Sequence, residues 1–321
     1  MRKRKLGLNG PELSVIGFGA WAVGGPWKWG WGPVESSQAI DAMHRALDLG
    51  VNWIDTAPVY GLGRSERLVG KAVKGRRDKV FIATKCGLRW KDQRLFNDIS
   101  PKSIREEIEA SLSRLDVETI DLYHIHWPNA NQSESRAWQE LLRLKKEGKV
   151  RWIGVSNFDA GLLEKIERLG HADSLQPPYN LVQRQAETEL LPFCKSHGIG
   201  VVTYSPMLSG LLSGAFDRAK LAADDWRCKS PMFNEPELTR HLQLVETLRR
   251  IAARYDCTVG QLAVAWVLRC PEVTSAIVGA RSIQQVEENV IAADCLISKQ
   301  DALEMDAMLE NWRDNERTER Q

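Results

Sequence analysis

Four residues in the first half of the chain could together move a proton: Asp55, Tyr60, Lys85 and His126. A tyrosine titrates at about pH 10 in water, too high for efficient proton exchange at neutral pH, but a desolvated ammonium within hydrogen-bonding distance favours the phenolate and lowers that pKa. Lys85 could supply the ammonium, and Asp55 would keep it charged and aimed. His126 could donate a hydrogen bond to the same carbonyl oxygen that Tyr60 protonates. These residue types predict a carbonyl-reduction site that still needs a source of hydride.

The chain around these residues alternates between short runs rich in β-branched residues and longer amphipathic runs. The short runs are typical of strands and lie at 15–20, 51–55, 79–85, 119–127, 150–156, 174–176, 199–205 and 275–279. Each precedes a helical pattern, and these patterns cover 36–49, 64–74, 101–115, 133–147, 159–169, 187–197, 239–255 and 282–292. Ser100 and Pro101 form a helix-start signal, and Gly50 stands where a helix should end. Such units without a compositional break favour an α/β fold closed into a (β/α)8 TIM barrel over an open doubly wound sheet.

Three stretches lie outside this repeat. Residues 3–14 contain an Asn-Gly-Pro turn and predict an N-terminal hairpin across the bottom of the barrel. Residues 259–269 predict one extra helix, and 300–311 predict a C-terminal helix. No linker composition divides the chain, so we expect residues 1–321 to form a single barrel domain.

Polar residues gather where the predicted strands end. Asp55 ends the second strand, Lys85 the third and His126 the fourth. Later strand ends supply Ser156, Asn157, Gln176, Tyr204, Gly279 and Arg281. Each of these, taken singly, could be a cap, an ion-pair partner or a packed aromatic. As a set they predict an active site, because parallel barrels build it at these ends and because a buried Lys–Asp pair perturbs neighbouring titratable groups.

The composition is that of an ordinary globular protein. The 321 residues are 43% apolar and 27% charged, with a formal net charge of +2, which does not favour a nucleic-acid or membrane surface. The six cysteines are scattered without Cys-x-x-Cys spacing, which indicates reduced thiols rather than a zinc site or a disulfide framework. The sequence shows neither a signal-peptide pattern nor a membrane-length apolar run, so we expect a cytoplasmic protein.

The motifs around these residues resemble those of the aldo-keto reductase superfamily, in its bacterial NADP(H)-dependent branch. The matching segments are DTAPVYGLGRSERLVG (55–70), TKCG (84–87), DLYHIHWP (121–128), GVSNF (154–158), QPPYN (176–180) and GAR (279–281). They occur in the family's order and cover nearly the whole chain. The resemblance implies a (β/α)8 barrel that reduces aldehydes or ketones to alcohols, with Tyr60 as general acid in a catalytic tetrad with Asp55, Lys85 and His126.

The resemblance also implies the residues that bind NADP(H). Ser156, Asn157 and Gln176 would hold the nicotinamide carboxamide, and the ring of Tyr204 would stack on the nicotinamide. Leu208 and Ser209 would contact the pyrophosphate. Arg281 and Gln285 would meet the 2′-phosphate and Asn289 the adenine, although the chain has Gly279-Ala280 where better-known animal members carry lysine and serine. The remaining expected cofactor contacts are Trp21, Ser205, Gly279 and Glu288.

Four tryptophans fall in the loop that follows the first strand: Trp21, Trp27, Trp29 and Trp31. Interleaved with glycines, they predict an aromatic wall or lid over the substrate. We expect Trp21, Trp29 and Trp127 to line the substrate pocket and small or aromatic aldehydes to be the substrates. The pocket walls come from the loops 21–33, 87–99, 127–132 and 206–234, and the pattern of residues does not predict their shapes.

Two other functions are compatible with this sequence. His124 and His126 lie on one face of a strand at a metal-ligand spacing, as in a metal-dependent barrel hydrolase, although we find no further ligand cluster and interpret His124 as a supporting residue. Alternatively, the chain could be a cofactor-binding regulatory subunit that resembles the potassium-channel β subunits. Steady-state turnover separates these functions from the reductase, and nothing in the sequence sets the oligomeric state.

Overall fold

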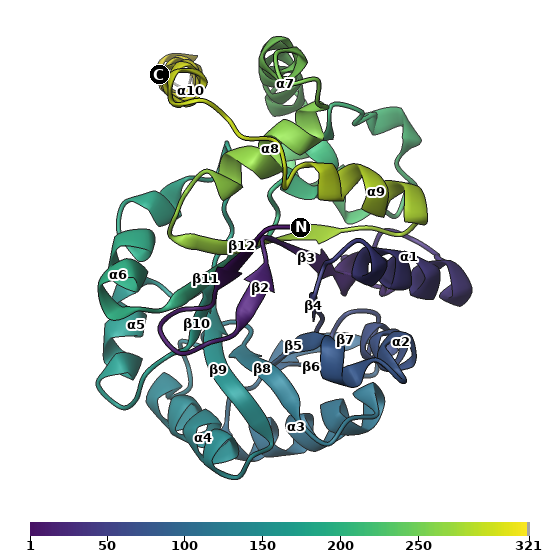
Figure 1. The fold of residues 1–321 in the computed structure, drawn as a ribbon, viewed down its shortest axis with the longest axis vertical. Coiled ribbons are helices and arrows are strands. Elements are labelled where there is room, and N and C mark those ends of the chain that lie inside the picture. The colour runs from purple at the N-terminus through teal and green to yellow at the C-terminus, as the bar shows by residue number, and fades with distance from the viewer. Residues whose placement is uncertain (320–321) are drawn as a thin grey trace.

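A computed structural model describes the backbone of residues 1–319 and the side chains through Arg313. Eight parallel strands close into a barrel in the order β3-β4-β5-β8-β9-β10-β11-β12, and β12 pairs with β3 (Figure 1). Their bounds are Ile16–Gly19 (β3), Trp53–Asp55 (β4), Phe81–Cys86 (β5), Ile120–Ile125 (β8), Val150–Ser156 (β9), Ser174–Gln176 (β10), Gly200–Thr203 (β11) and Val273–Gly279 (β12). The predicted (β/α)8 fold is therefore confirmed.

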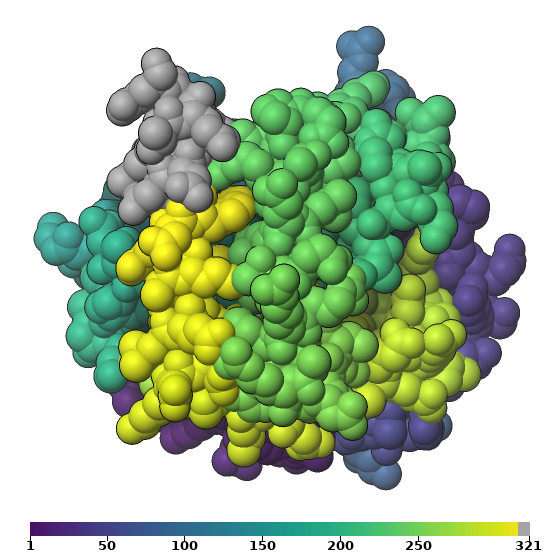
Figure 2. Space-filling model, turned by 90° about the horizontal axis from the view of Figure 1, so that it is seen from above, coloured from purple at the N-terminus to yellow at the C-terminus, as the bar shows by residue number. Residues whose placement is uncertain are grey.

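Helices surround the barrel (Figure 1). They are α1 (Ser36–Asp48), α2 (Arg64–Val73), α3 (Pro101–Leu115), α4 (Glu134–Lys146), α5 (Ala160–Glu167), α6 (Leu190–His197), α7 (Glu237–Ala253), α8 (Val259–Leu268), α9 (Ile283–Ile291) and α10 (Lys299–Glu319). The Ser100 hydroxyl caps α3 by accepting from the Ser103 amide, as the sequence indicated. Helix α8 is the predicted extra helix; it packs between β12 and α7 and is buried along its whole length. The C-terminal helix α10 continues beyond residue 311, its predicted end. On the face shown in Figure 2, α7 lies between α10 and α9.

The predicted N-terminal hairpin is also present. Strands β1 (Lys3–Lys5) and β2 (Glu12–Ser14) pair antiparallel. Leu6 and Leu13, from this hairpin, are fully buried in an apolar cluster with the barrel residues Trp53 and Leu122. Because this cluster fills the interior, the polar side chains of the strands are left at the opposite, carboxyl end of the barrel.

The loops at that end contain structure that the sequence did not predict. Strands β6 (Leu88–Lys91) and β7 (Arg94–Asn97) form a hairpin where only a loop was expected. Its turn places Asp92 and Gln93 at φ 47° and 67°, a conformation that an Asn-Gly or Asp-Gly pair would have signalled. Short 3-10 turns occur at Ala20–Val23 (η1), Arg77–Lys79 (η2), Gln185–Glu187 (η3), Leu208–Ser213 (η4), Arg218–Lys220 (η5), Trp226–Lys229 (η6) and Pro231–Phe233 (η7).

Candidate active site

Lys85 is the centre of a buried polar group at the carboxyl end of the barrel. Asp55 pairs with Ala83 across β4 and β5, and Lys85 lies two residues further along β5, so the side chains of Asp55 and Lys85 enter the barrel together. Lys85 Nζ, which is fully buried, lies 2.7 and 2.8 Å from the two carboxylate oxygens of Asp55 and 2.9 Å from the carbonyl oxygen of Thr56. It also donates to Tyr60 Oη at 3.3 Å. Three of the four expected catalytic residues are therefore in direct contact.

His126 completes this group from the next strand. It follows β8, and its ring lies 5.8 Å from that of Tyr60, centroid to centroid, in an edge-to-face arrangement. Asn157 Nδ2 donates to the His126 carbonyl oxygen at 2.9 Å and so ties the ends of β8 and β9 together. His124, two residues earlier, is fully buried, and its Nε2 lies 3.2 Å from Ser174 Oγ. Its ring is therefore held by a residue of β10.

The protonation states in this group differ in one respect from the expectation. Burial, assisted by the negative charge of Asp55, raises the pKa of Tyr60 well above its usual value. The expected net lowering of this pKa is therefore wrong, because burial and the negative charge of Asp55 outweigh the opposing effect of the Lys85 ammonium 3.3 Å away. Burial and the charge of Lys85 hold the pKa of His126 well below its usual value. At neutral pH the site thus presents a protonated phenol beside a neutral imidazole.

The residues expected to contact the nicotinamide, by holding its carboxamide or stacking on its ring, lie at the ends of the next three strands. Ser156 Oγ donates to the Gln176 carbonyl oxygen at 2.8 Å, and Tyr204 Oη donates to Asn157 Oδ1 at 2.8 Å. Gln176 Nε2 donates to Asp55 Oδ2 at 2.9 Å, a link that the sequence analysis did not foresee. These four residues and the Asp55 carboxylate thus belong to one continuous hydrogen-bonded network.

The expected pyrophosphate contacts lie in the irregular turn that follows β11. Ser205, Leu208 and Ser209 have φ values of 56°, 48° and 53°, and Gly210 follows at 92°. Within this left-handed stretch, the side chain of Leu208 packs into the core. Arg227 Nη1, from η6, donates to the Ser209 carbonyl oxygen at 3.1 Å. Arg227 is a residue that the sequence analysis missed, because it lies in the long loop 206–234.

A groove of about 270 Å³ lies at the expected adenosine end. It is lined by Pro33, Val34, Gln38, Arg281, Ser282 and Gln285. Gln285 Oε1 accepts from the Arg281 amide at 2.8 Å, and Arg281 Nη1 donates to the Trp31 carbonyl oxygen at 2.7 Å. Of the expected residues, Arg281 and Gln285 therefore come together in one groove.

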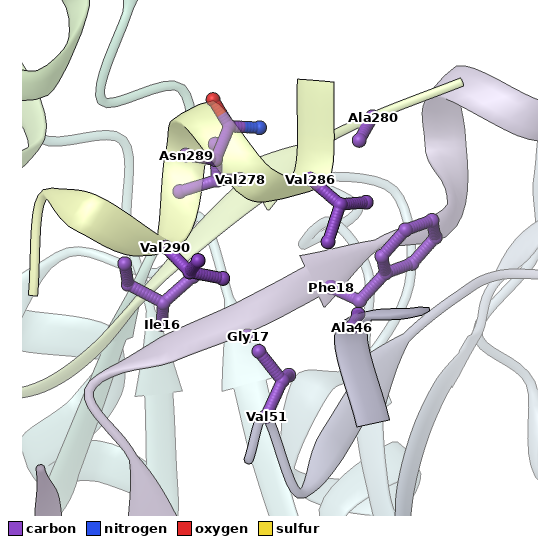
Figure 3. Close-up of a pocket in the computed structure, with 10 residues that line it drawn as sticks. All are labelled: Ile16, Gly17, Phe18, Ala46, Val51, Val278, Ala280, Val286, Asn289 and Val290. Atoms are coloured by element: carbon purple, nitrogen blue, oxygen red, sulfur yellow. The ribbon is translucent and has the colours of Figure 1, made fainter. Parts of the chain in front are cut away.

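The other expected adenosine residues lie beside this groove. Asn289 projects from α9 and borders a small apolar cavity between β3 and α9 (Figure 3), and its Nδ2 donates to the Gly279 carbonyl oxygen at 3.3 Å. Glu288 is exposed, and its carboxylate accepts from Gln284 on the same helix. The structure therefore brings Asn289 and Gly279 together and leaves Glu288 turned to solvent.

The tryptophans of the first loop divide into two sets. The ring of Trp27 lies 5.9 Å from Tyr60, and Trp29 packs edge-on against Trp27 at 5.7 Å. Trp21 instead lies 5.0 Å from Trp31 and 6.4 Å from Trp226 of η6. Trp27 is thus the tryptophan packed against the phenol, whereas the sequence analysis favoured Trp21 for substrate contact.

In the second set, arginine side chains pack against the ring of Trp31. The guanidinium groups of Arg227 and Arg281 lie 5.2 and 6.0 Å from the ring of Trp31. Arg64, on α2, anchors the loop by donating to the carbonyl oxygens of Val23 and Val34 at 2.8 and 2.7 Å. These contacts join the tryptophan loop to the expected cofactor groove.

Two expected pocket residues lie at the outer edge of the site. The side chains of Trp29 and Trp127 are 36% and 44% exposed. Asn97, at the end of the β6-β7 hairpin, donates to the carbonyl oxygens of Trp127 and Pro128. The hairpin therefore supports the loop after β8 and forms part of the rim around Tyr60 and His126.

No three His, Cys, Asp or Glu side chains among residues that the structure describes are grouped to hold a metal ion. His124 is bonded to Ser174 instead of joining His126 at a shared ligand position. Within this part of the chain, no helix has the length and apolar character needed to cross a bilayer.

A closed parallel barrel with a buried acid/base group at the carboxyl ends of its strands defines a (β/α)8 barrel enzyme. The model of the aldo/keto reductase family matches residues 15–310, and the chain belongs to this family. It is an oxidoreductase that acts on carbonyl or alcohol groups, and its family uses a nicotinamide cofactor.

Two curated bacterial proteins are similar over nearly the full chain. The NADH-specific methylglyoxal reductase of Escherichia coli is 37% identical over 97% of this chain and 99% of its own length. The aldo-keto reductase YhdN of Bacillus subtilis is 38% identical over 94% and 92%. Among solved structures, the glycerol dehydrogenase AKR11B4 of Gluconobacter oxydans is 36% identical with a TM-score of 0.84, covering 97% of this chain and 94% of that chain. The holo form of AKR11C1 from Bacillus halodurans is 28% identical with a TM-score of 0.80, covering 96% of each chain.

Proposed function

We propose that this protein reduces small or aromatic aldehydes and ketones to alcohols with NADP(H), and that Tyr60 is the general acid. The observation that carries the proposal is the contact of Lys85 Nζ with Tyr60 Oη while Lys85 is held by both oxygens of Asp55. The relatives support the substrate class, since one is named a methylglyoxal reductase and another a glycerol dehydrogenase. The functional unit in this proposal is the single domain 1–321 in the cytoplasm, where its cysteines would remain free.

The raised pKa of Tyr60 suits a proton donor in the direction of reduction. The phenol stays protonated until negative charge develops on the carbonyl oxygen of the substrate. When the proton leaves, the phenolate oxygen gains charge 3.3 Å from the Lys85 ammonium. This hydrogen bond is stronger to a phenolate than to a phenol, so Lys85 stabilises the transition state more than the ground state. Asp55 keeps Lys85 in place for this role.

His126 would orient the carbonyl oxygen. Its neutral imidazole carries one N–H and lies edge-to-face with Tyr60, so a carbonyl oxygen that reaches Tyr60 Oη can also accept from His126. Trp27 covers the phenol on another side and excludes water from this position. The rim residues Trp29 and Trp127 offer apolar surface to a flat substrate.

The described residues fit a nicotinamide dinucleotide. Gln176 and Asn157 present amide groups beside Asp55 and Tyr204, and the groove at Arg281 offers a guanidinium and the start of α9 to a phosphate. When bound, the reduced nicotinamide supplies the hydride that these side chains do not have. We assign the NADP(H) preference to Arg281, although the Escherichia coli relative is named NADH-specific. The ratio of kcat/KM for NADPH and NADH measures this assignment directly.

The substitution Tyr60→Phe tests the proposed acid. Phenylalanine keeps the ring packing against Trp27 and removes only the proton, so kcat should fall by about 10² to 10⁴ while the fold and cofactor affinity persist. The matched control is Tyr123→Phe, since Tyr123 is a buried tyrosine of β8 that packs in the outer apolar core. Turnover followed by cofactor absorbance, circular dichroism and cofactor titration are compared for both variants. A folded, cofactor-binding Tyr60→Phe protein with near-wild-type turnover would overturn the mechanism.

A regulatory subunit remains the second candidate from the sequence. The completeness of the Asp55, Tyr60, Lys85 and His126 group favours turnover, because a protein that only binds cofactor does not need a proton donor. Tight NADPH binding without turnover on a panel of aldehydes, ketones and sugars would instead favour the regulatory role.

A further inference from the structure

Two cysteines far apart in the sequence meet on the helical side of the molecule. Cys257 lies in the connection between α7 and α8, and Cys295 lies in the connection between α9 and α10. Their Sγ atoms are 3.8 Å apart, although 38 positions separate them in the chain. Both side chains are partly exposed, so small reagents can reach them from solvent.

The two connections are already fastened to each other next to the cysteines. Tyr255 Oη accepts from the Ser298 amide at 2.8 Å and donates to the Asp301 carboxylate. Arg254 pairs with the carboxylates of Asp301 and Glu304 at 2.5 and 2.6 Å. Since these bonds fix the backbone within three residues of each cysteine, the sulfurs stay near each other. A disulfide requires about 2.05 Å between them, so oxidation would draw the two sulfurs closer together.

The other cysteines have different neighbours. Cys86 Sγ donates to the His124 carbonyl oxygen, Cys228 Sγ to the Ala222 carbonyl oxygen, and Cys270 Sγ to the carboxylate of Glu272. Cys194 is fully buried. The sulfur-to-sulfur contact of Cys257 and Cys295 therefore distinguishes this pair from the remaining thiols.

We propose that Cys257 and Cys295 form a reversible disulfide when the protein meets a peroxide, here hydrogen peroxide. One of the two sulfurs, as thiolate, attacks one peroxide oxygen; the O–O bond breaks, and that cysteine becomes a sulfenic acid as hydroxide leaves and takes up a proton to become water. The other sulfur then attacks the sulfenic sulfur, the S–S bond forms, and a second water leaves. In sum, two thiols lose two electrons and two protons, and one peroxide becomes two waters.

Both thiols are held mainly in their protonated form. Burial, with a contribution from the neighbouring Cys295, raises the pKa of Cys257 to about 12, and burial also raises the pKa of Cys295. Because both thiolates are scarce at neutral pH, oxidation takes minutes or longer and the pair is reduced under ordinary reducing conditions.

The bond would join elements that lie behind the cofactor groove. Cys257 precedes Thr258, which caps α8, and Gln261 of α8 donates to the Glu288 carbonyl oxygen on α9 at 2.8 Å. Closing this loop of the chain restricts the unfolded state, so the oxidised protein should melt roughly 5 °C higher than the reduced protein. The catalytic residues lie elsewhere in the barrel, so their chemistry is left unchanged.

The test counts thiols on the full-length protein over a time course of treatment with hydrogen peroxide. Wild type has six cysteines, and after treatment, unfolding and alkylation it should carry two fewer alkyl groups, with Cys257 and Cys295 recovered in one cross-linked peptide. Dithiothreitol should restore all six. The melting temperature should rise on oxidation and return on reduction.

Single variants provide the controls. On peroxide treatment, Cys257→Ser and Cys295→Ser should neither lose two alkylatable thiols nor show the rise in melting temperature. Both variants should retain wild-type turnover when reduced. The matched control is Cys228→Ser, another partly exposed cysteine, which should still lose two thiols on oxidation. Retention of all thiols by wild type would overturn the proposal. So would an equal loss in Cys257→Ser, or simple addition of oxygen to Cys295 without a cross-link.

Discussion

Glu107 allows a test of how burial changes the pKa of an ionisable side chain in this barrel. Its carboxylate is buried on α3 and accepts from the Gly87 amide at 3.1 Å with each oxygen and from Ser103 Oγ at 3.0 Å. Gly87 follows the β5 strand that carries Lys85. Burial outweighs these hydrogen bonds and the charge of Arg89, and it raises the pKa of Glu107 from 4.5 to about 7.

The sign of the effect on stability follows from proton linkage. The folded state binds the Glu107 proton more tightly than the unfolded state, so the stabilisation is fully present below pH 4.5 and is lost as pH rises through about 7. The shift corresponds to about 3 kcal/mol in full, and most of this free energy is lost between pH 5 and pH 8. Glutamine does not titrate, yet it retains an acceptor for the Gly87 amide.

Chemical denaturation of wild type and Glu107→Gln at pH 5 and pH 8 measures this difference. The free energy of unfolding of the variant relative to wild type should rise by roughly 2 to 3 kcal/mol from the lower to the higher pH, because every other group titrates equally in both proteins. Glu109→Gln is the control, since Glu109 lies on the exposed side of the same helix. If Glu107→Gln and Glu109→Gln show the same pH dependence, burial does not hold the Glu107 proton and the reasoning fails.

Three further predictions concern the proposed reductase. Lys85→Met should lower kcat by about 10² or more while cofactor titration shows retained binding, because the ammonium stabilises the phenolate; an undiminished kcat would remove Lys85 from the mechanism. Arg281→Ala should raise the KM for NADPH by about 10- to 100-fold and leave that for NADH unchanged, whereas equal use of both cofactors by wild type would contradict the role of Arg281. Gln176→Leu should raise the cofactor KM by about tenfold and shift the pH profile of kcat, since it removes a donor to Asp55; an unmoved pH profile would limit Gln176 to cofactor binding.

Local pattern was sufficient to predict the barrel and to place its polar residues. The periods of strands and helices, the Ser100 cap and the strand-end positions of Asp55, Lys85 and His126 are all written in short segments, because side-chain direction repeats every two residues in a strand and about every 3.6 in a helix. The roles of these residues stay predictions. The β6-β7 hairpin was not predicted, because its Asp92-Gln93 turn adopts positive φ without glycine or asparagine.

Tertiary packing decided the contacts and pKa shifts that involve residues distant from one another in the sequence. The sequence placed Gln176 and Asp55 121 positions apart, and only the closed barrel joins their side chains. The direction of the Tyr60 pKa shift depended on how completely the site is buried and on Asp55 offsetting Lys85. The packing of Trp27 against Tyr60 and of Cys257 against Cys295 likewise depended on how separate loops meet. Local sequence encodes the direction of side chains and the propensity for helix or strand. The burial of a side chain, its contacts and the charges around it depend on residues distant in the chain, so they are fixed only when the barrel closes.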